Sequence, residues 1–165
     1  MADSEKLTST QIGSISEHVV AARLMVASNG RLSPFFPAAD DSGIDLIMFD
    51  KVSGRAAPIQ IKNRTRTIKK TPNVVHFEVL KATFETRRDG YVLAVLFEEN
   101  LANLVERRAW LIPMADFADV ARKPSAKFVM RPSWDANSRD KYSAYRCNDL
   151  GDVARRLIIS MNGPT

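Results

Sequence analysis

Two short apolar segments joined by a turn constrain the fold of this 165-residue chain most strongly. Ile44–Asp50 and Ala57–Asn63 are apolar at nearly every position, which is typical of central strands covered on both faces. Lys51–Arg55, between them, contains the Ser-Gly pair of a turn. Pro58 cannot donate to a strand ladder, so the second strand should begin at a sheet edge or a bulge. The sequence therefore predicts a strand–turn–strand unit within a larger sheet.

The rest of the chain predicts an α/β domain with a mixed central sheet and helices on its faces. A helix is expected from about Thr8 to Ser28, since apolar residues recur at helical spacing and Asn29-Gly30 is a stop signal. Other expected strands are Leu32–Phe36, Val74–Leu80, Tyr91–Phe97, Arg108–Ile112, Lys127–Arg131 and Lys141–Cys147. Other expected helices are Ala82–Arg88, Met114–Ala121 and a last one from Asn148 or Asp149 to about Met161.

The central strands bring three polar side chains to one face. With a turn centred on residues 53–54, Asp45 lies opposite Lys62, and Ile47 lies opposite Gln60. Alternate residues of a strand share a face, so the acid, the amide and the ammonium group project from the same side. The core-facing side would carry Ile44, Leu46, Ile59 and Ile61. A simple Asp45–Lys62 salt bridge is the alternative explanation, but it leaves Gln60 unexplained.

Glu17 is a further candidate, placed by the first predicted helix. The core stripe of this helix is expected to consist of the apolar residues Ile12, Ile15, Val19, Ala22 and Val26. Glu17 forms a second line with Gly13 and Ala21, each four residues away. These small neighbours would let another element approach and leave the carboxylate in a crevice. A solvated helix face is the alternative.

A basic stretch continues from the second strand. The net charge of +5 fits a polyanionic partner without proving one. If the chain stays extended, residues two apart project from one face as a row, and the row would consist of Gln60, Lys62, Arg64 and Arg66, followed by Lys69 and Lys70. Such a row can follow a phosphate backbone and would make binding strongly salt-dependent. A solvated extension of the strand is the alternative.

These residues, in this order, resemble the PD-(D/E)XK nuclease superfamily, in particular its Holliday-junction-resolvase-like and Mrr-like restriction endonuclease branch. The resemblance covers residues from about 12 to 66, and it depends on three segments in order: Gly13-x-x-x-Glu17, then Ser42-Gly43-Ile44-Asp45-Leu46-Ile47, then Ile59-Gln60-Ile61-Lys62. It implies a restriction-endonuclease-like fold and a metal-dependent DNA endonuclease.

The resemblance also implies roles for the four residues. Asp45 would ligate a divalent metal, usually Mg²⁺ or Mn²⁺, Glu17 would act through a metal-bound water, and Lys62 would help orient the attacking water. Gln60 stands where most members have a carboxylate, so a catalytically inactive module that binds nucleic acid or a protein partner is the alternative. Asp40 and Asp41 could restore the missing charge, or they could be ordinary loop acids.

Composition excludes several kinds of site and of protein. A single cysteine, Cys147, excludes an internal disulfide and a cysteine-based zinc site, and only two histidines are present. No apolar run approaches the roughly 20 residues of a membrane span. The sequence therefore predicts one domain over residues 1–165, with 1–8 and 163–165 frayed, in the cytoplasm and without a membrane partner. A homodimer is plausible because cutting both DNA strands needs two sites.

Overall fold

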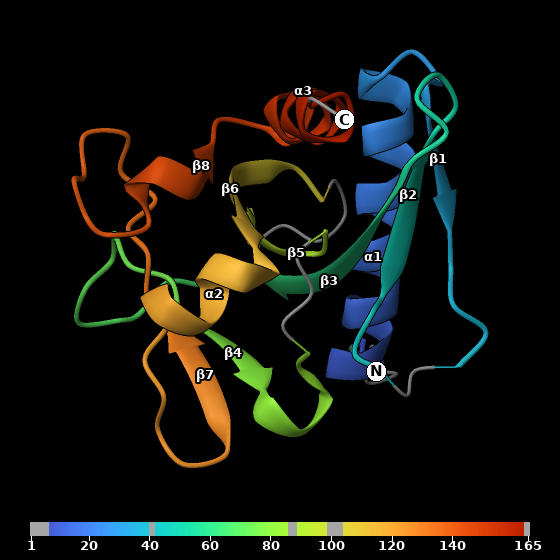
Figure 1. Ribbon diagram of the computed structural model, residues 1–165. Helices are drawn as coiled ribbons and strands as arrows, with labels where there is room; N and C mark the ends of the chain where they lie inside the picture. The colour runs from blue at the N-terminus through green and yellow to red at the C-terminus, as the bar shows by residue number, and fades with distance from the viewer. Residues whose placement is uncertain (1–6, 40–41, 86–88, 99–103, 164–165) are drawn as a thin grey trace, which may run out of the picture.

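The computed structural model describes residues 7–39, 42–85, 89–98 and 104–163. At its centre is a six-stranded sheet in the order β1-β2-β3-β5-β6-β8 (Figure 1). Its strands are β1 (Leu32–Phe35), β2 (Leu46–Asp50), β3 (Ala56–Arg64), β5 (Tyr91–Phe97), β6 (Glu106–Pro113) and β8 (Arg146–Cys147). β3 and β5 run parallel, whereas the other neighbouring pairs are antiparallel. The predicted mixed α/β architecture is confirmed.

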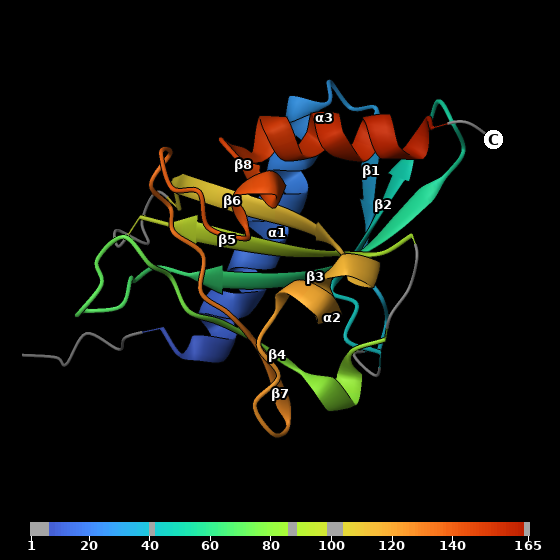
Figure 2. The same ribbon diagram turned by 60° about the vertical axis from the view of Figure 1, so that its left-hand side comes forward.

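Two layers cover this sheet. Helices α1 and α3 pack on one face, whereas α2 and a separate two-stranded sheet of β4 and β7 lie on the other (Figure 2). Each face buries its own apolar cluster, so the sheet is covered on both sides, as the apolar central strands predict. The bounds are α1 (Ser9–Ala27), α2 (Met114–Val120), α3 (Leu150–Met161), β4 (Phe77–Leu80) and β7 (Lys127–Met130).

Several element predictions were wrong in extent. The strand expected from Val74 begins at Phe77, and it pairs with β7 outside the central sheet, while Val74 forms only an isolated bridge with Ser133. The helix expected over residues 82–88 is a single 3₁₀ turn at Lys81–Thr83, and residues 86–88 lie outside the described part of the chain. The strand expected over residues 141–147 is a 3₁₀ turn at Ser143–Tyr145, followed by the two-residue β8.

The buried face of α1 also differs from the predicted stripe. Ile15 and Val26, which were expected in the core, are 40% and 72% exposed. The helix is apolar on most sides, so spacing alone does not identify the side that packs on the sheet. The residues that it buries are Ser16, Val20, Ala21 and Leu24. This face lies next to Glu17, which is half-buried.

The hairpin of β2 and β3 is shifted by two residues from the predicted register. Leu46 lies opposite Ile59, and the turn closes through a 2.8 Å bond from the Gly54 N–H to the Asp50 carbonyl. Gly54 has a φ of +71°, a conformation that glycine adopts without strain. A shift of two residues preserves the face of every side chain, so Gln60 and Lys62 stay on the predicted side of the sheet.

The buried Asp50 carboxylate explains this register. It accepts hydrogen bonds from the Val52 N–H at 3.0 Å and the Ser53 hydroxyl at 2.9 Å, which fixes the turn directly after β2. Its two oxygens also accept the Nε and Nη2 protons of Arg31, each at 2.8 Å. The turn thus begins at Lys51, and its centre lies one residue earlier than the Ser-Gly pair indicates.

Ile44 and Pro58 mark the ends of the regular pairing. Ile44 packs in the cluster beneath β4 and α2, not on the predicted side with Leu46, because it precedes the start of β2. Pro58 lies inside β3 opposite Ile47, whereas pairing of β3 with β5 begins only at Ile59. Its missing N–H therefore falls where β5 offers no partner.

Candidate functional site

Asp45 lies at the point where the β2–β3 ladder ends. Its N–H donates to the Ile59 carbonyl at 3.0 Å, and its Oδ2 accepts the Ile61 N–H at 2.6 Å. Because β2 begins only at Leu46, the carboxylate takes the place of a strand carbonyl as the acceptor for Ile61. Backbone and side chain together hold this acid beside Gln60, the residue between its two bonding partners.

Gln60 is the most deeply buried of the four predicted residues, at 3% exposure. A Cβ built on Gly43 would lie 2.9 Å from Gln60 Nε2 and 2.5 Å from the Thr83 carbonyl, so only glycine lets the chain pass this closely. Gly43 also has a φ of +64°, which other residues rarely adopt. The close packing of Gly43 against Gln60 therefore fixes the position of the amide.

A cavity of about 310 Å³ brings Glu17 and Asp45 together. Glu17 reaches it from α1, and Asp45 reaches it from the chain just before β2, so two segments far apart in sequence supply carboxylates to one space. The crevice expected for Glu17 exists, although Gly13 contributes nothing to it, because a Cβ there would meet no atom within 4 Å. Gln60 and Lys62 do not line this cavity.

His18 also lines this cavity and is absent from the predicted site. Its ring stacks on Phe36 with the ring centroids 4.5 Å apart. The His18 Nδ1 lies 2.8 Å from the Ser14 carbonyl, which can only accept, so Nδ1 carries a proton. Its position directly after Glu17, as one of two histidines, was the only available signal.

Lys62 shares the face of Gln60, two residues along β3, and is half-buried opposite Ala94 of β5. The predicted basic row ends soon afterwards, because β3 stops at Arg64 and the chain bends at Thr65. Arg64 Nε donates to the His76 carbonyl at 3.0 Å. Arg66 follows the bend, so the prediction that it continues a straight row was wrong.

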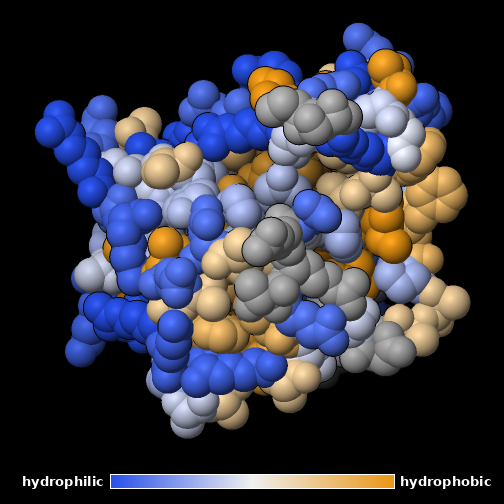
Figure 3. Space-filling model, viewed as in Figure 1, coloured by the Kyte–Doolittle hydropathy of each residue, from blue (hydrophilic) through white to orange (hydrophobic). Residues whose placement is uncertain are grey.

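Lys69 and Lys70 occupy the tip of a tight turn, which the 2.9 Å bond from the Thr71 N–H to the Ile68 carbonyl closes. Both side chains are exposed. The loop that follows β3 lies at the left of Figure 1, on the side of the molecule where hydrophilic side chains project in Figure 3. The basic residues thus form a bent, exposed loop that continues from β3.

His76 and Glu78 alternate along the chain, which allows either a place near the site or a polar strand face, and in the structure both belong to a surface network. Arg131 Nε donates to His76 Nδ1 at 3.1 Å, so the neutral ring carries its proton on Nε2, which donates to Glu78 at 3.1 Å. Lys127 adds a 2.6 Å bond to the same carboxylate. Lys127 and His76 together hold the pKa of Glu78 below its usual value. These contacts favour the polar-face interpretation.

Trp110 and Cys147 are core residues. Trp110 is fully buried against Phe77, and burial raises the pKa of the Cys147 thiol to about 11, so it is not a nucleophile at neutral pH. Neither residue takes part in the candidate site.

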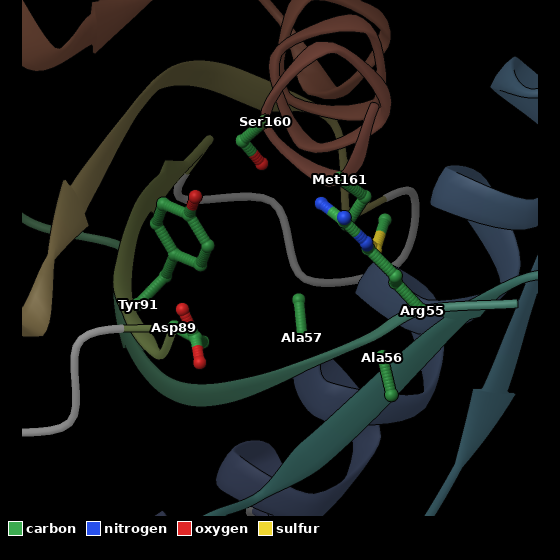
Figure 4. Close-up of a pocket in the computed structure, with 7 residues that line it drawn as sticks. All are labelled: Arg55, Ala56, Ala57, Asp89, Tyr91, Ser160 and Met161. Carbon is green, nitrogen blue, oxygen red and sulfur yellow. The ribbon is translucent and has the colours of Figure 1, made fainter. Parts of the chain in front are cut away.

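A larger cavity, of about 510 Å³, lies at the other end of β3 (Figure 4). Arg55, Asp89, Tyr91 and Ser160 supply its polar lining, from the starts of β3 and β5 and the end of α3. It has one carboxylate and one guanidinium group, and none of the predicted residues. Its size alone does not make it a better candidate, because the paired carboxylates lie in the smaller cavity.

No group of three or more His, Cys, Asp and Glu side chains able to hold a metal ion occurs among the described residues. The cavity instead brings together two carboxylates, those of Glu17 and Asp45, and Asp40 and Asp41 lie outside the described part of the chain. Within that part, no helix is long and apolar enough to cross a membrane.

No model of a protein family matches this chain, and no curated protein matches its sequence. Among solved structures, the bacterial homing endonuclease I-Ssp6803I superposes with a TM-score of 0.56 at 17% identity, over 94% of each chain. The chain has the restriction-endonuclease-like fold. The Holliday junction resolvase Hjc of Archaeoglobus fulgidus also matches, with a TM-score of 0.47 at 9% identity, over 83% of this chain and 98% of that one. The superposition on the homing endonuclease confirms the predicted fold class.

Proposed function

We propose that the protein is a metal-dependent DNA endonuclease with Glu17, Asp45, Gln60 and Lys62 at its active site. The observation that carries this proposal is the position of Asp45. Its carboxylate is fixed on the Ile61 N–H between Gln60 and Lys62, and it shares a cavity with Glu17 from α1. The same fold in a homing endonuclease supports a phosphodiester substrate.

The donor set fits a hard divalent cation. Mg²⁺ prefers oxygen ligands and commonly keeps several waters, using only one or two protein carboxylates together with substrate phosphate. Asp45 and Glu17 would supply the carboxylates, and the Gln60 amide would supply a neutral oxygen. When bound, such a cation polarises a phosphoryl oxygen and lowers the pKa of a bound water.

The protein side chains have separate roles in this proposal. Asp45 is held rigidly by two hydrogen bonds to β3, which keeps its carboxylate oriented at little entropic cost. Lys62 projects from the same strand face as Gln60, where its ammonium group stabilises negative charge that develops on the phosphate. Glu17 accepts a hydrogen bond from a water and so helps to position it.

Gln60 favours a second candidate function. An amide in this buried position removes one negative charge, which weakens cation binding compared with a carboxylate. The second candidate is therefore a module that keeps the nuclease fold without catalysis and binds nucleic acid or a protein in a repair, restriction or defence system.

Nicking of supercoiled plasmid and of branched DNA, with Mg²⁺ or Mn²⁺ and with EDTA, separates the two functions. We expect cation-dependent nicking that Lys62→Ala and Asp45→Asn each reduce by at least about 100-fold, which is typical for loss of one transition-state contact. A Lys51→Ala control, in the turn at the far end of the hairpin, should cut normally. Lys62→Ala that cuts as fast as the wild type would refute the proposed chemistry.

A further inference from the structure

Two loops far apart in sequence are joined through one side chain, Trp134. Its backbone N–H donates to the Asn73 carbonyl at 2.9 Å, and its indole N–H donates to the Pro72 carbonyl at 3.0 Å. A bridge between Val74 and Ser133 continues the junction. The loops, residues 65–75 and 131–142, lie along one edge of the molecule (Figures 1 and 2). We call them together the two-loop surface.

The start of β6 strengthens this junction. The Arg107 guanidinium carbon lies 4.7 Å from the centroid of the Trp134 ring, and Arg108 Nε donates to the Trp134 carbonyl at 3.2 Å. The edge and one face of the indole are therefore already occupied by protein. This arrangement makes Trp134 a structural pin, rather than the base-stacking platform that its position in a loop allows.

The acids of the second loop are turned inward. Asp140 accepts the Ser133 N–H at 2.7 Å and the Tyr142 N–H at 2.8 Å. Asp135 accepts the Asn137 N–H at 2.9 Å. The loop is also held to β8, because the Arg146 guanidinium donates to three of its carbonyls. These acids define the shape of the loop and are not directed at an incoming ligand.

The cations of both loops are directed outward. Within the described part of the chain, the side chains of Arg66, Lys69, Lys70 and Arg139 have no hydrogen bond or ion pair, and all four are exposed. Lys141 is exposed as well, and its Nζ lies 5.3 Å from the centroid of the Tyr142 ring. Residues 63–77 contain no acid. A surface with fixed loops and unpaired cations suits a rigid polyanion, because ordering it costs little.

We propose that the two-loop surface, pinned by Trp134, grips the phosphate backbone of duplex DNA beyond the cleavage site. The first loop leaves β3 directly after Lys62 and Arg64, so DNA at the site continues onto it. The second loop, which carries Arg139 and Lys141, lies beside it through the Trp134 junction. This inference rests on the proposed function for its choice of DNA as the partner.

Fluorescence anisotropy with a labelled duplex of about 30 base pairs in EDTA, at salt concentrations between about 50 and 300 mM, measures binding without cleavage. Arg139→Gln combined with Lys141→Gln should lower the slope of log K against log salt by about 2, since each phosphate contact contributes roughly 0.9. We also expect affinity at about 100 mM salt to fall by about tenfold or more. The matched control, Lys51→Gln with Arg55→Gln, removes the same charge at the opposite end of β3 and should bind like the wild type.

Trp134 is tested as a positioning residue. Trp134→Ala should lower the affinity for DNA and the slope of log K against log salt, while Lys62-dependent cleavage of excess DNA at low salt persists. Trp134→Phe should restore part of the slope, because it keeps a ring beside the Arg107 guanidinium. If Arg139→Gln combined with Lys141→Gln leaves affinity and slope at wild-type values, the inference is overturned. Loop-dependent DNA binding without any cation-dependent nicking would instead overturn the proposed function and leave the two-loop surface standing.

Discussion

Replacing Gln60 with glutamate tests the candidate site most directly. The substitution is isosteric, so it changes charge without changing volume at a side chain that is only 3% exposed. Asp45 bonds to the residues on either side of Gln60, so the two are cross-strand neighbours, whose Cβ atoms usually lie about 5 Å apart, and we take a similar separation for two carboxylates at these positions. At an effective dielectric constant near 20, the repulsion between two such charges is about 3 kcal/mol.

This repulsion sets the expected effect on stability. An energy of about 3 kcal/mol raises the folded-state pKa of the new glutamate by roughly two units. The penalty is complete at pH values above the raised folded-state pKa, and it disappears as the pH falls toward the ordinary value for glutamate. At about pH 8 without divalent cations, Gln60→Glu should therefore lower the free energy of unfolding by about 2–3 kcal/mol, and the melting temperature by about 5–10 °C.

A bound cation should turn the destabilising effect of Gln60→Glu into a stabilising one. Between two carboxylates, Mg²⁺ removes the repulsion, and it stabilises the folded state in proportion to its affinity. Thermal unfolding followed by circular dichroism, in EDTA and in about 10 mM MgCl₂ at about pH 8 and pH 5.5, measures all four conditions. We expect the variant to gain more from Mg²⁺ than the wild type and to nick DNA at lower Mg²⁺ concentrations.

A double-mutant cycle with Asp45→Asn provides the control. Without the charge of Asp45, the substitution at position 60 should cost much less in EDTA, with a coupling energy of about 2 kcal/mol. If Gln60→Glu is as stable as the wild type in EDTA at about pH 8 and does not respond to Mg²⁺, the two side chains do not share a site. That result would refute a metal centre built on Asp45 and position 60.

Four further substitutions test the scaffold around the site by chemical denaturation. Asp50→Asn should lower the free energy of unfolding by about 3–5 kcal/mol, because it breaks a buried ion pair. Arg31 holds the pKa of Asp50 far below its usual range, so the wild type has this stability above about pH 4 and loses it as the pH falls. The variant should lose less stability over the same fall in pH. Gly43→Ala should lower the free energy of unfolding by about 1–3 kcal/mol and weaken Mg²⁺ binding, because its Cβ would lie 2.5 Å from the Thr83 carbonyl. Gly13→Ala is the control: its Cβ would meet nothing within 4 Å, so it should stabilise α1 by up to about 1 kcal/mol. Trp110→Phe should cost less than about 1.5 kcal/mol, since it also removes a buried indole N–H that has no partner among the described residues, and it leaves Trp134 as the sole fluorescent tryptophan.

The sequence determined the face of the hairpin better than its register. Apolar alternation requires Leu46 and Ile59 on one side, and any shift by two residues satisfies it equally. The actual register depends on the buried Asp50, whose role requires Arg31, a residue that only the folded chain brings near. A strand pattern cannot reveal such a contact, so Gln60 and Lys62 of β3 were placed on the correct face but with the wrong partners in β2.

The first helix shows the opposite problem. Its predicted stripe followed helical spacing from Ile12 to Val26, yet the buried face combines Val20 and Leu24 with the small residues Ser16 and Ala21. A helix that is apolar on most sides gives no clear direction, and close packing against a sheet then favours small side chains. The rotation brings Glu17 next to the buried face and into a cavity with Asp45. The crevice expected for Glu17 is therefore present, but the helix line through Gly13 plays no part in it.

The second half of the proposed DNA surface had no sequence signal at all. Residues 131–142 combine three cations with two acids, and their net charge is therefore small. What distinguishes the cations is that the acids are committed to the loop's own N–H groups, as Asp140 shows, whereas Arg139 is exposed and unpaired within the described residues. The net charge of a segment counts its acids and cations equally, but a ligand meets only the side chains that the fold directs outward. The salt slope of DNA binding measures this difference, because it counts the phosphates that are contacted and not the charges that are present.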